Sequence, residues 1–593
     1  MSSTSNQSSI APHELTREKT HDAYNYDNLE GWRRFRLMRP GWGMYHDIRR
    51  RLPYYKSDIT DAFTYRTVAS IIRMYFVNLL PALAYTLDMY RRTGEFFGVN
   101  EALFSSALAA MVFSILGAQP LTIVGITGLI SLFNYTIYDI IVQYDVSIYP
   151  QFMCWTAIWA AIFHWLAAIW NTCDYMRYVT EFSSESFGMY VGIIYIIKGV
   201  EELVSEFSSR GSTDGYLSCT VAILYFATIY ALEKLGSSTI FRPSFRGFLA
   251  DYAYPLGTIF WVGFVHIPGR LKEANISKVP ITMAFHPTQP RNWLISFWEL
   301  DVKWIFVAIP FGFLTMLLFY YDHNVSSLTA QSRQFPLKKP GGFHWDFFLL
   351  GCTTFVAGIL GLPMPNGLVP QAPVHTDSLT IYETDIVIIS TSEGEGAEVR
   401  RPVVKATAVV EQRVSHFFMG LALIGTMTGP LLAVLHTMPA AVFAGVFFVV
   451  GWGSIESNGI TEKLIFLFKE NRFIQRGEPM LTLRRRKITL YIAIQLFGVL
   501  SCVAISQTIA AIGFPVLICL LIPLRVVLLP KWFTLKELEV MDDLTANNKV
   551  VLASLGGAPI LPEGAEIEDY GRERRYEERK RGVTRQRTGS VHR

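Results

Sequence analysis

The chain is poor in charged residues and in cysteines for its length. Only 17% of its 593 residues are charged, whereas soluble domains contain roughly a quarter. The six cysteines show no CxxC spacing, so the sequence supports neither a zinc site nor a disulfide framework. A Walker A motif is also missing, which leaves ATP-driven transport without support. The sequence indicates no cofactor and no metal.

Long hydrophobic runs take the place of charge. Hydrophobic residues make up 51% of the chain, and its mean hydropathy is +0.28. Runs of about 18 to 22 apolar residues are long enough to cross the hydrocarbon core of a bilayer as helices. We expect about fourteen such spans, half of them on each side of the loop 268–292. The third is expected over Pro120–Ile137, the seventh over Gly247–Ile267 and the eleventh over Val414–Leu435.

The polar ends and the basic loops predict an orientation. The N-terminal stretch has no apolar segment of the signal-peptide kind, so the first span is expected to direct insertion. Basic residues gather in loops assigned to one side, most strongly at Arg484–Lys487, and an even number of spans then places both termini in the cytoplasm. The expected organisation is a cytoplasmic tail over 1–60, a transmembrane domain over 61–545 and a cytoplasmic tail over 546–593.

The two tails have different compositions. The N-terminal tail ends in a mixture of Arg and aromatic residues, which fits a segment attracted to anionic lipid at the cytoplasmic surface. It fits equally a solvated tail that only sets the orientation. The C-terminal tail is highly charged and is expected to be disordered and solvated, with no nucleic-acid partner.

Two segments are too rich in Gly, Pro and polar residues to form continuous lipid-facing helices. They are Gly117–Gly128 and Gly361–Asp377, each the third element of its half of the chain. Backbone interrupted in this way survives in a membrane only where protein or a water-filled cavity satisfies it. Matched breaks in two halves indicate an inverted-repeat transporter, with half-helix N-termini facing an anion at the midplane. The alternative is a pair of Pro-kinked helices that simply pack together.

Ionisable groups inside the spans are the next candidates, because they are costly there and usually functional. Asp322 ends the eighth span, close to the expected second break. Its protonation would remove repulsion of an anion, which makes it a candidate proton-coupling group. The alternative is a carboxylate bonded to backbone at a helix end. Arg73 and Lys198, the latter near Glu201 and Glu202, are expected to form structural ion pairs or to reach the membrane surface.

A loose grouping of His375, Asp377 and Ser378 could suggest hydrolysis. A catalytic triad needs convergence in space, which adjacency along the chain does not supply, and no nucleophile-elbow pattern is present. We therefore do not expect an enzyme. A secondary transporter or a channel remains.

Strings along the membrane domain resemble the bicarbonate transporter (anion exchanger) family, and within it the borate exporters of fungi and plants. They are LGAQPLTIVGITG, DHNVSSLTAQ, GGFHWDFFLLG, GLPMPNGLVPQAPVHTDSLT, VVEQRV and IPLRVVLLPKWFTLKELEVMDD. The resemblance implies an all-α fold of fourteen segments in two inverted repeats, with half-helices at segments three and ten. It also implies an elevator-like motion and a homodimer. The implied core covers about 61–175 and 300–436, and the implied gate about 186–268 and 437–530.

The resemblance also implies the site. The third half-helix is expected to begin near Gln119 to Thr122, and the tenth near Gln371 to Thr376. The family's acidic position in the eighth span falls on Asp322. The residues expected to bind the substrate are Gln119, Pro120, Leu121, Thr122, Asp322, Gln371 and Thr376.

Gln371 narrows the expected substrate from a small anion to borate. The family's chloride/bicarbonate exchangers have an arginine where this chain has Gln371. An amide both donates and accepts hydrogen bonds, which suits a polyhydroxylated anion such as B(OH)4⁻ better than a halide. The expected function is borate export across the plasma membrane, with the vacuolar membrane as a second location. A bicarbonate/chloride exchanger, an anion channel and a membrane scaffold on the same fold are the alternatives.

Overall fold

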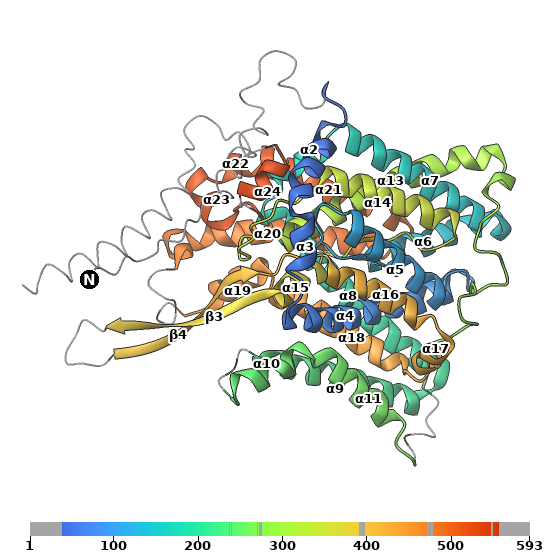
Figure 1. The fold of residues 1–593 in the computed structure, drawn as a ribbon, viewed down its shortest axis with the longest axis horizontal. Coiled ribbons are helices and arrows are strands. Elements are labelled where there is room, and N and C mark those ends of the chain that lie inside the picture. The colour runs from blue at the N-terminus through green and yellow to red at the C-terminus, as the bar shows by residue number, and fades with distance from the viewer. Residues whose placement is uncertain are drawn as a thin grey trace, which may run out of the picture.

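Most of the described chain is helical, and its long helices run side by side (Figure 1). The structure is a computed structural model. It describes residues 38–236, 240–269, 276–390, 398–470, 478–546 and 549–556, together with residues 238, 271, 472 and 474. The expectations for most of the N-terminal tail and for the end of the C-terminal tail lie outside these residues.

The helices of the first half precede the loop 268–292. They are α2 (Trp42–Arg51), α3 (Tyr55–Thr60), α4 (Tyr65–Arg92), α5 (Val99–Leu116), α6 (Gly128–Ile141), α7 (Tyr149–Ile169), α8 (Glu181–Arg210), α9 (Ser212–Gly236), α10 (Pro243–Asp251) and α11 (Ala253–Val265).

The helices of the second half follow the same loop. They are α13 (Val302–Ala330), α14 (His344–Ile359), α15 (Gln371–Ser378), α16 (Val414–Thr426), α17 (Gly429–His436), α18 (Ala440–Glu456), α19 (Gly459–Phe468), α20 (Arg485–Ser506), α21 (Phe514–Val527), α22 (Leu529–Trp532), α23 (Leu535–Met541) and α24 (Lys549–Ser554).

The number of full spans is smaller than the number of expected segments. In the described residues, seven helices are long and apolar enough to cross a membrane, or up to ten if each of three bent pairs is one span. The shorter helices α6 and α14, the more charged α8 and the half-helix α15 stand at the remaining expected positions. The expected seventh and eleventh spans are each broken, between α10 and α11 by 64° and between α16 and α17 by 83°.

The first span shows how local sequence sets a helix boundary. The Thr64 side chain accepts a hydrogen bond from the backbone N–H of Thr67 and caps the start of α4. Arg91 and Arg92 lie in the last turn, where positive charge favours the helix dipole. Together they define the ends of a 28-residue helix.

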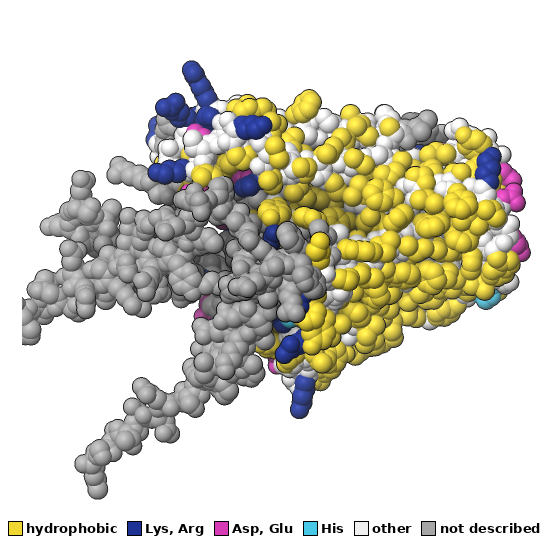
Figure 2. Space-filling model, turned by 90° about the horizontal axis from the view of Figure 1, so that it is seen from above, with side chains coloured by type: hydrophobic (Ala, Val, Ile, Leu, Met, Phe, Trp, Pro, Cys, Tyr) yellow, Lys and Arg dark blue, Asp and Glu magenta, His cyan; other side chains and the backbone are white. Residues whose placement is uncertain are grey.

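The helices pack in two groups. In one, α7 packs against α13 and α14, and α16 packs against α4 and α5. In the other, α18 packs against α8 and α9, and α9 also contacts α10 and α11. Hydrophobic side chains cover the long side of the molecule, while Lys, Arg, Asp and Glu gather at its ends (Figure 2). This distribution is that of a chain crossing a bilayer.

Two antiparallel strand pairs accompany the helices. β1 (Val124–Gly125) pairs with β2 (Asn366–Gly367), and β3 (Thr380–Ser390) pairs with β4 (Glu398–Val409). The hairpin β3–β4 projects from one end of the molecule (Figure 1). It was not expected, although its run of β-branched residues at Ile386–Ile389 favours a strand.

Candidate functional site

The two interrupted segments meet inside the molecule. Val124 pairs with Gly367 and Gly125 with Asn366 in the short ladder of β1 and β2. The Leu368 N–H also donates a 2.9 Å hydrogen bond to the Ile123 carbonyl. Protein backbone thus satisfies the polar groups that a broken helix would expose to hydrocarbon.

Glycine allows this close approach. A Cβ at position 367 would lie 2.8 Å from the His323 Cα, and one at position 125 would lie 3.0 Å from the Asn78 side-chain oxygen. A side chain at position 367 would collide with backbone, and one at position 125 would require the Asn78 side chain to move, so glycine at both positions favours the close approach of the segments.

A half-helix begins directly after each strand of this pair. α6 begins at Gly128, where the Thr127 hydroxyl oxygen accepts a 3.3 Å hydrogen bond from the Ile130 N–H. α15 begins at Gln371, after Pro370. Unpaired N–H groups and the positive end of the helix dipole make such N-termini suited to anions.

Both N-termini line one small cavity of about 20 Å³. The lining comes from five parts of the chain: α4, α8, α13 and the two interrupted segments with the starts of their half-helices. The lining residues are Tyr85, Thr127, Gly128, Leu129, Val191, Ile194, Tyr195, Asp322, Leu368, Val369, Pro370 and Gln371. They include no Lys or Arg, so any attraction for an anion at this cavity would come from the helix ends.

Asp322 lies on α13 and faces this cavity. It is 2% exposed, and its carboxylate accepts a 2.7 Å hydrogen bond from the Asn366 amide. The Asn366 side-chain oxygen in turn accepts a 2.8 Å hydrogen bond from the Gly367 N–H. The strand β2 therefore holds the carboxylate in place next to the half-helices.

Gln371 has an unsatisfied side chain. It is 1% exposed, and neither its amide oxygen nor its amide nitrogen makes a hydrogen bond of standard geometry to the described residues. A buried polar group without a partner costs about 1–3 kcal/mol. Such a group beside a cavity and a helix N-terminus indicates a ligand with hydroxyl or oxyanion groups.

Two tyrosines complete the wall. The rings of Tyr85 and Tyr195 lie 5.3 Å apart, edge to face, with Tyr85 on α4 and Tyr195 on α8. The Tyr85 hydroxyl also makes no hydrogen bond of standard geometry, and its ring lies so close to Gly128 that a methyl group there would collide with it. No sequence pattern marked these two tyrosines as site residues, because aromatic side chains are common in membrane spans.

The expected start of the third half-helix is wrong. Gly117–Ile123 is not helical, and α6 begins at Gly128. The backbone N–H groups of Ala118 and Gln119 donate to the Asp346 carboxylate at 2.6 and 2.9 Å, which holds this stretch in a turn. Proline at position 120 also opposes a helix across this stretch.

Gln119 and its neighbours therefore lie apart from the cavity. Gln119, Pro120, Leu121 and Thr122 are all buried, but none is among the residues that line it. The Leu121 carbonyl is 2.8 Å from the His375 ring, near the end of α15. Thus the structure brings Asp322 and Gln371 together and separates them from this segment.

Thr376 also lies outside the cavity lining. Its hydroxyl donates a 2.8 Å hydrogen bond to the Ala330 carbonyl and so fastens α15 to the end of α13. Two other polar side chains of this segment also bond to protein groups. The second ring nitrogen of His375 is 2.8 Å from the Ser415 hydroxyl, and the Ser378 hydroxyl donates to the His375 carbonyl. The side chains of His375, Asp377 and Ser378 thus contact Ser415, Tyr382 and Ser70 respectively.

The other candidate residues that the sequence singled out, Arg73, Lys198, Glu201 and Glu202, form ion pairs, which is one of the two expected outcomes. Arg73 is 3.7 Å from Asp377, and Lys198 is 3.2 Å from Asp88 and 2.7 Å from Glu201. Glu202 pairs with Arg91. These pairs lie outside the cavity lining.

The apolar belt, the crossed segments and the paired half-helices define a multi-pass membrane protein with the architecture of a transporter. The chain belongs to the HCO3⁻ transporter family, whose integral membrane domain matches residues 39–215 and 208–546. The expected fold class is confirmed.

Relatives and solved structures agree with this assignment. The chain is 45% identical to the putative transporter C543.05c of Schizosaccharomyces pombe over 84% of this chain and 95% of that protein. It is 40% identical to boron transporter 1 of Saccharomyces cerevisiae over 88% of each protein. The solved structure of SLC26A9 superposes with a TM-score of 0.51 at 12% identity, over 82% of this chain and 68% of that one, which supports the fold alone.

Proposed function

We propose that this protein is a secondary transporter that exports borate. The observation that carries the proposal is Gln371: a buried amide that makes no hydrogen bond of standard geometry, at the N-terminus of α15, in a cavity that no Lys or Arg lines. The similarity to a protein named for boron transport supports the same substrate.

The lining suits a substrate that carries its own hydroxyl groups. The Gln371 amide and the hydroxyls of Tyr85, Tyr195 and Thr127 each donate and accept hydrogen bonds. Borate has four hydroxyls and one negative charge, so it matches both these groups and the two helix N-termini. A halide could use only the donors and would leave acceptors unpaired, which disfavours chloride.

Asp322 is the group we assign to proton coupling. When ionised, its carboxylate places a negative charge beside the anion site; protonation removes the repulsion and leaves the hydrogen bond with Asn366 available. Binding of borate together with a proton at Asp322 would make the movement of borate depend on the pH difference across the membrane.

The motion we propose is an elevator-like displacement of one helix group against the other. The core would contain α4 to α7 and α13 to α17, and the gate α8 to α11 and α18 to α21. Asp322 and Gln371 belong to the core, whereas Tyr195 belongs to the gate. The cavity lies between the groups, so their relative movement would open it toward either side.

Cellular placement follows from this role. An exporter that protects a cell from boron is placed in the plasma membrane, with both termini in the cytoplasm, where the basic loops are expected. The vacuolar membrane would serve the same end by sequestration. The homodimer remains part of the proposal, with contacts through the gate.

Boron tolerance tests the function directly. A host that lacks its own exporter is grown on high boric acid with this chain, with the Asp322→Asn variant or with an empty vector, and cell boron is measured. The intact chain should restore growth and lower cell boron, while the variant should match the vector. Unchanged boron content with the intact chain at the cell surface would overturn the proposal.

A further inference from the structure

The segment before the first span crosses the ends of the long helices. α2, a short turn at Leu52–Tyr54 and α3 run across the direction in which α4, α5 and α16 run (Figure 1). α4 begins at Tyr65, only a few residues later. A segment with this direction, next to the start of a span, would lie in the plane of the membrane surface.

One face of this segment is anchored to the helix group of the site. Asp47 is fully buried, and its carboxylate accepts hydrogen bonds from the N–H groups of His344 and Trp345 at 2.9 and 3.2 Å. These are the first two N–H groups of α14, so Asp47 satisfies donors that the helix leaves unpaired.

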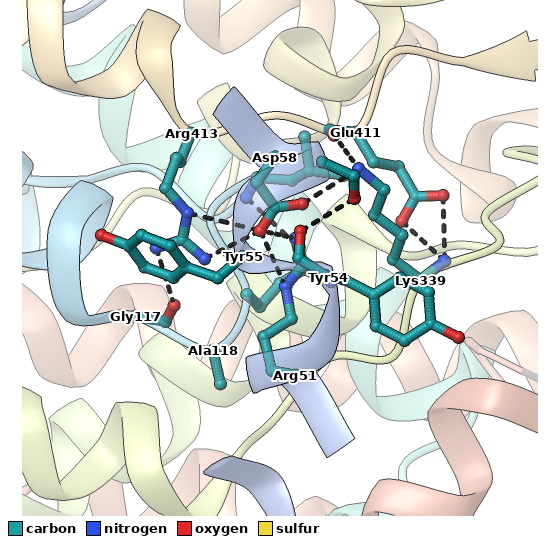
Figure 3. A network of polar contacts seen from close by, with 12 residues as sticks. Arg51, Tyr54, Tyr55, Asp58, Gly117, Ala118, Lys339, Glu411 and Arg413 are labelled. Carbon is teal, nitrogen blue, oxygen red and sulfur yellow. Dashed lines mark hydrogen bonds and ion pairs between the residues drawn. The ribbon is translucent and has the colours of Figure 1, made fainter. Parts of the chain in front are cut away.

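Asp58 makes the second attachment (Figure 3). Its buried carboxylate lies 2.7 Å from the Arg51 guanidinium, 2.8 Å from that of Arg413 and 3.1 Å from the Lys339 ammonium. Arg413 also donates to the Ser114 carbonyl at the end of α5. The cluster thus joins α3 to the C-terminal end of α5 and to the start of α16.

The opposite face of the segment is apolar and basic. Its exposed apolar side chains are Tyr45, Ile48, Leu52, Ile59 and Phe63, which is 87% exposed. Arg49 and Lys56 are exposed between them, and the described residues form no ion pair with either. 

We propose that this face, defined by these five apolar residues with Arg49 and Lys56, binds anionic phospholipid at the membrane surface. The apolar side chains would enter the boundary between headgroups and acyl chains, and the two bases would pair with headgroup charge. Charge complementarity and the position beside α4 favour lipid over a protein partner. Because the other face is tied to Asp58 and α14, the lipid holds the site's helix group at the membrane surface.

Lipid retention tests the proposal without reference to any transported substrate. The full chain in detergent is titrated with phosphatidylserine or with phosphatidylcholine, and bound lipid is measured by native mass spectrometry. The double variant Arg49→Gln/Lys56→Gln removes two charges from the face. The matched control Lys278→Gln/Lys303→Gln removes two exposed charges elsewhere.

The first variant should lose roughly fivefold in phosphatidylserine affinity for each base, or about 25-fold in all, since each is worth about 1 kcal/mol near an anionic surface. Phosphatidylcholine binding and the control should be unchanged. Equal losses in both double variants, or no loss in the first, would overturn the proposal. A change in oligomer mass of the first variant without a change in lipid binding would assign the face to a protein interface instead.

Discussion

The Asn366 amide donates a 2.7 Å hydrogen bond to the Asp322 carboxylate and so links β2 to α13 at the edge of the cavity. One residue belongs to the second interrupted segment, and the other to a span that precedes it by a long stretch of sequence. This contact places the ionisable group of the site next to the crossing of the two segments. Any change in the protonation of Asp322 therefore acts where both half-helices begin.

Asp322→Asn should abolish borate export while the protein still reaches the membrane. The amide has the same shape but cannot exchange a proton, so coupling is lost even if packing is kept. Efflux is measured as boron released from loaded cells. Asp145→Asn, in an exposed loop, is the control and should behave like the parent. Full efflux by Asp322→Asn would remove Asp322 from the mechanism.

Gln371→Arg should change the substrate rather than only reduce transport. A guanidinium at the start of α15 supplies a positive charge but no acceptor, so borate efflux should fall and chloride exchange should rise. Radiolabelled chloride and boron fluxes are compared in the same cells. Gln371→Met should lose borate efflux without gaining chloride exchange. If arginine left the two fluxes in their original ratio, Gln371 would not set selectivity.

Tyr195→Phe should weaken borate binding without unfolding the protein. Loss of one hydrogen bond, worth about 1 kcal/mol, would raise the apparent KM for borate about fivefold. Tyr190→Phe on the same helix is the matched control, because Tyr190 is also buried but does not line the cavity. Equal KM changes in the two variants would show that the effect is on packing and not on the substrate.

Asp58→Asn should destabilise the protein by about 3 kcal/mol or more, since it leaves buried guanidinium groups without their counter-charge. Asp61→Asn, which breaks a half-exposed pair with Lys339, should cost less than about 1 kcal/mol. Thermal unfolding in detergent compares the two. Similar melting temperatures would contradict the structural role of Asp58.

The same residue predicts a pH dependence of stability. Burial opposes ionisation of Asp58, but the charge of Arg51 and hydrogen bonds from Arg413 and Arg51 outweigh it, so its pKa is lowered from 3.8. Its stabilising contribution is therefore present above that pH and is lost as pH falls through the lowered pKa of the folded protein. The melting temperature of the parent should drop on acidification below about pH 4, and that of Asp58→Asn should drop less.

The sequence was informative where local chemistry decides structure. Clustered Gly and Pro residues predicted both interrupted segments, since such residues cannot continue a helix in lipid. Asp322 stood out as a carboxylate in an apolar run. Gln371 stood out because the family's chloride/bicarbonate exchangers have an arginine at the corresponding position. The structure places these two residues in one cavity.

Contacts between residues far apart in the sequence could not be predicted from the sequence in the same way. The family resemblance suggested a helix start near Gln119 to Thr122, but Asp346, on a helix far away in the sequence, holds this stretch in a turn. Tyr85 and Tyr195 reach the cavity through the packing of α4 and α8, which periodicity along one chain does not show. Thr376 has a polar side chain in the right segment, yet it bonds to Ala330 at the end of α13 and does not line the cavity.

Boron flux from proteoliposomes tests the central claim most directly. The purified chain is reconstituted with borate inside, a pH gradient is imposed, and released boron is measured by mass spectrometry beside chloride in matched vesicles. The account predicts boron release that depends on the protein and on the gradient and that Asp322→Asn abolishes. The account would be contradicted if the protein released chloride while boron release stayed at the level of protein-free vesicles.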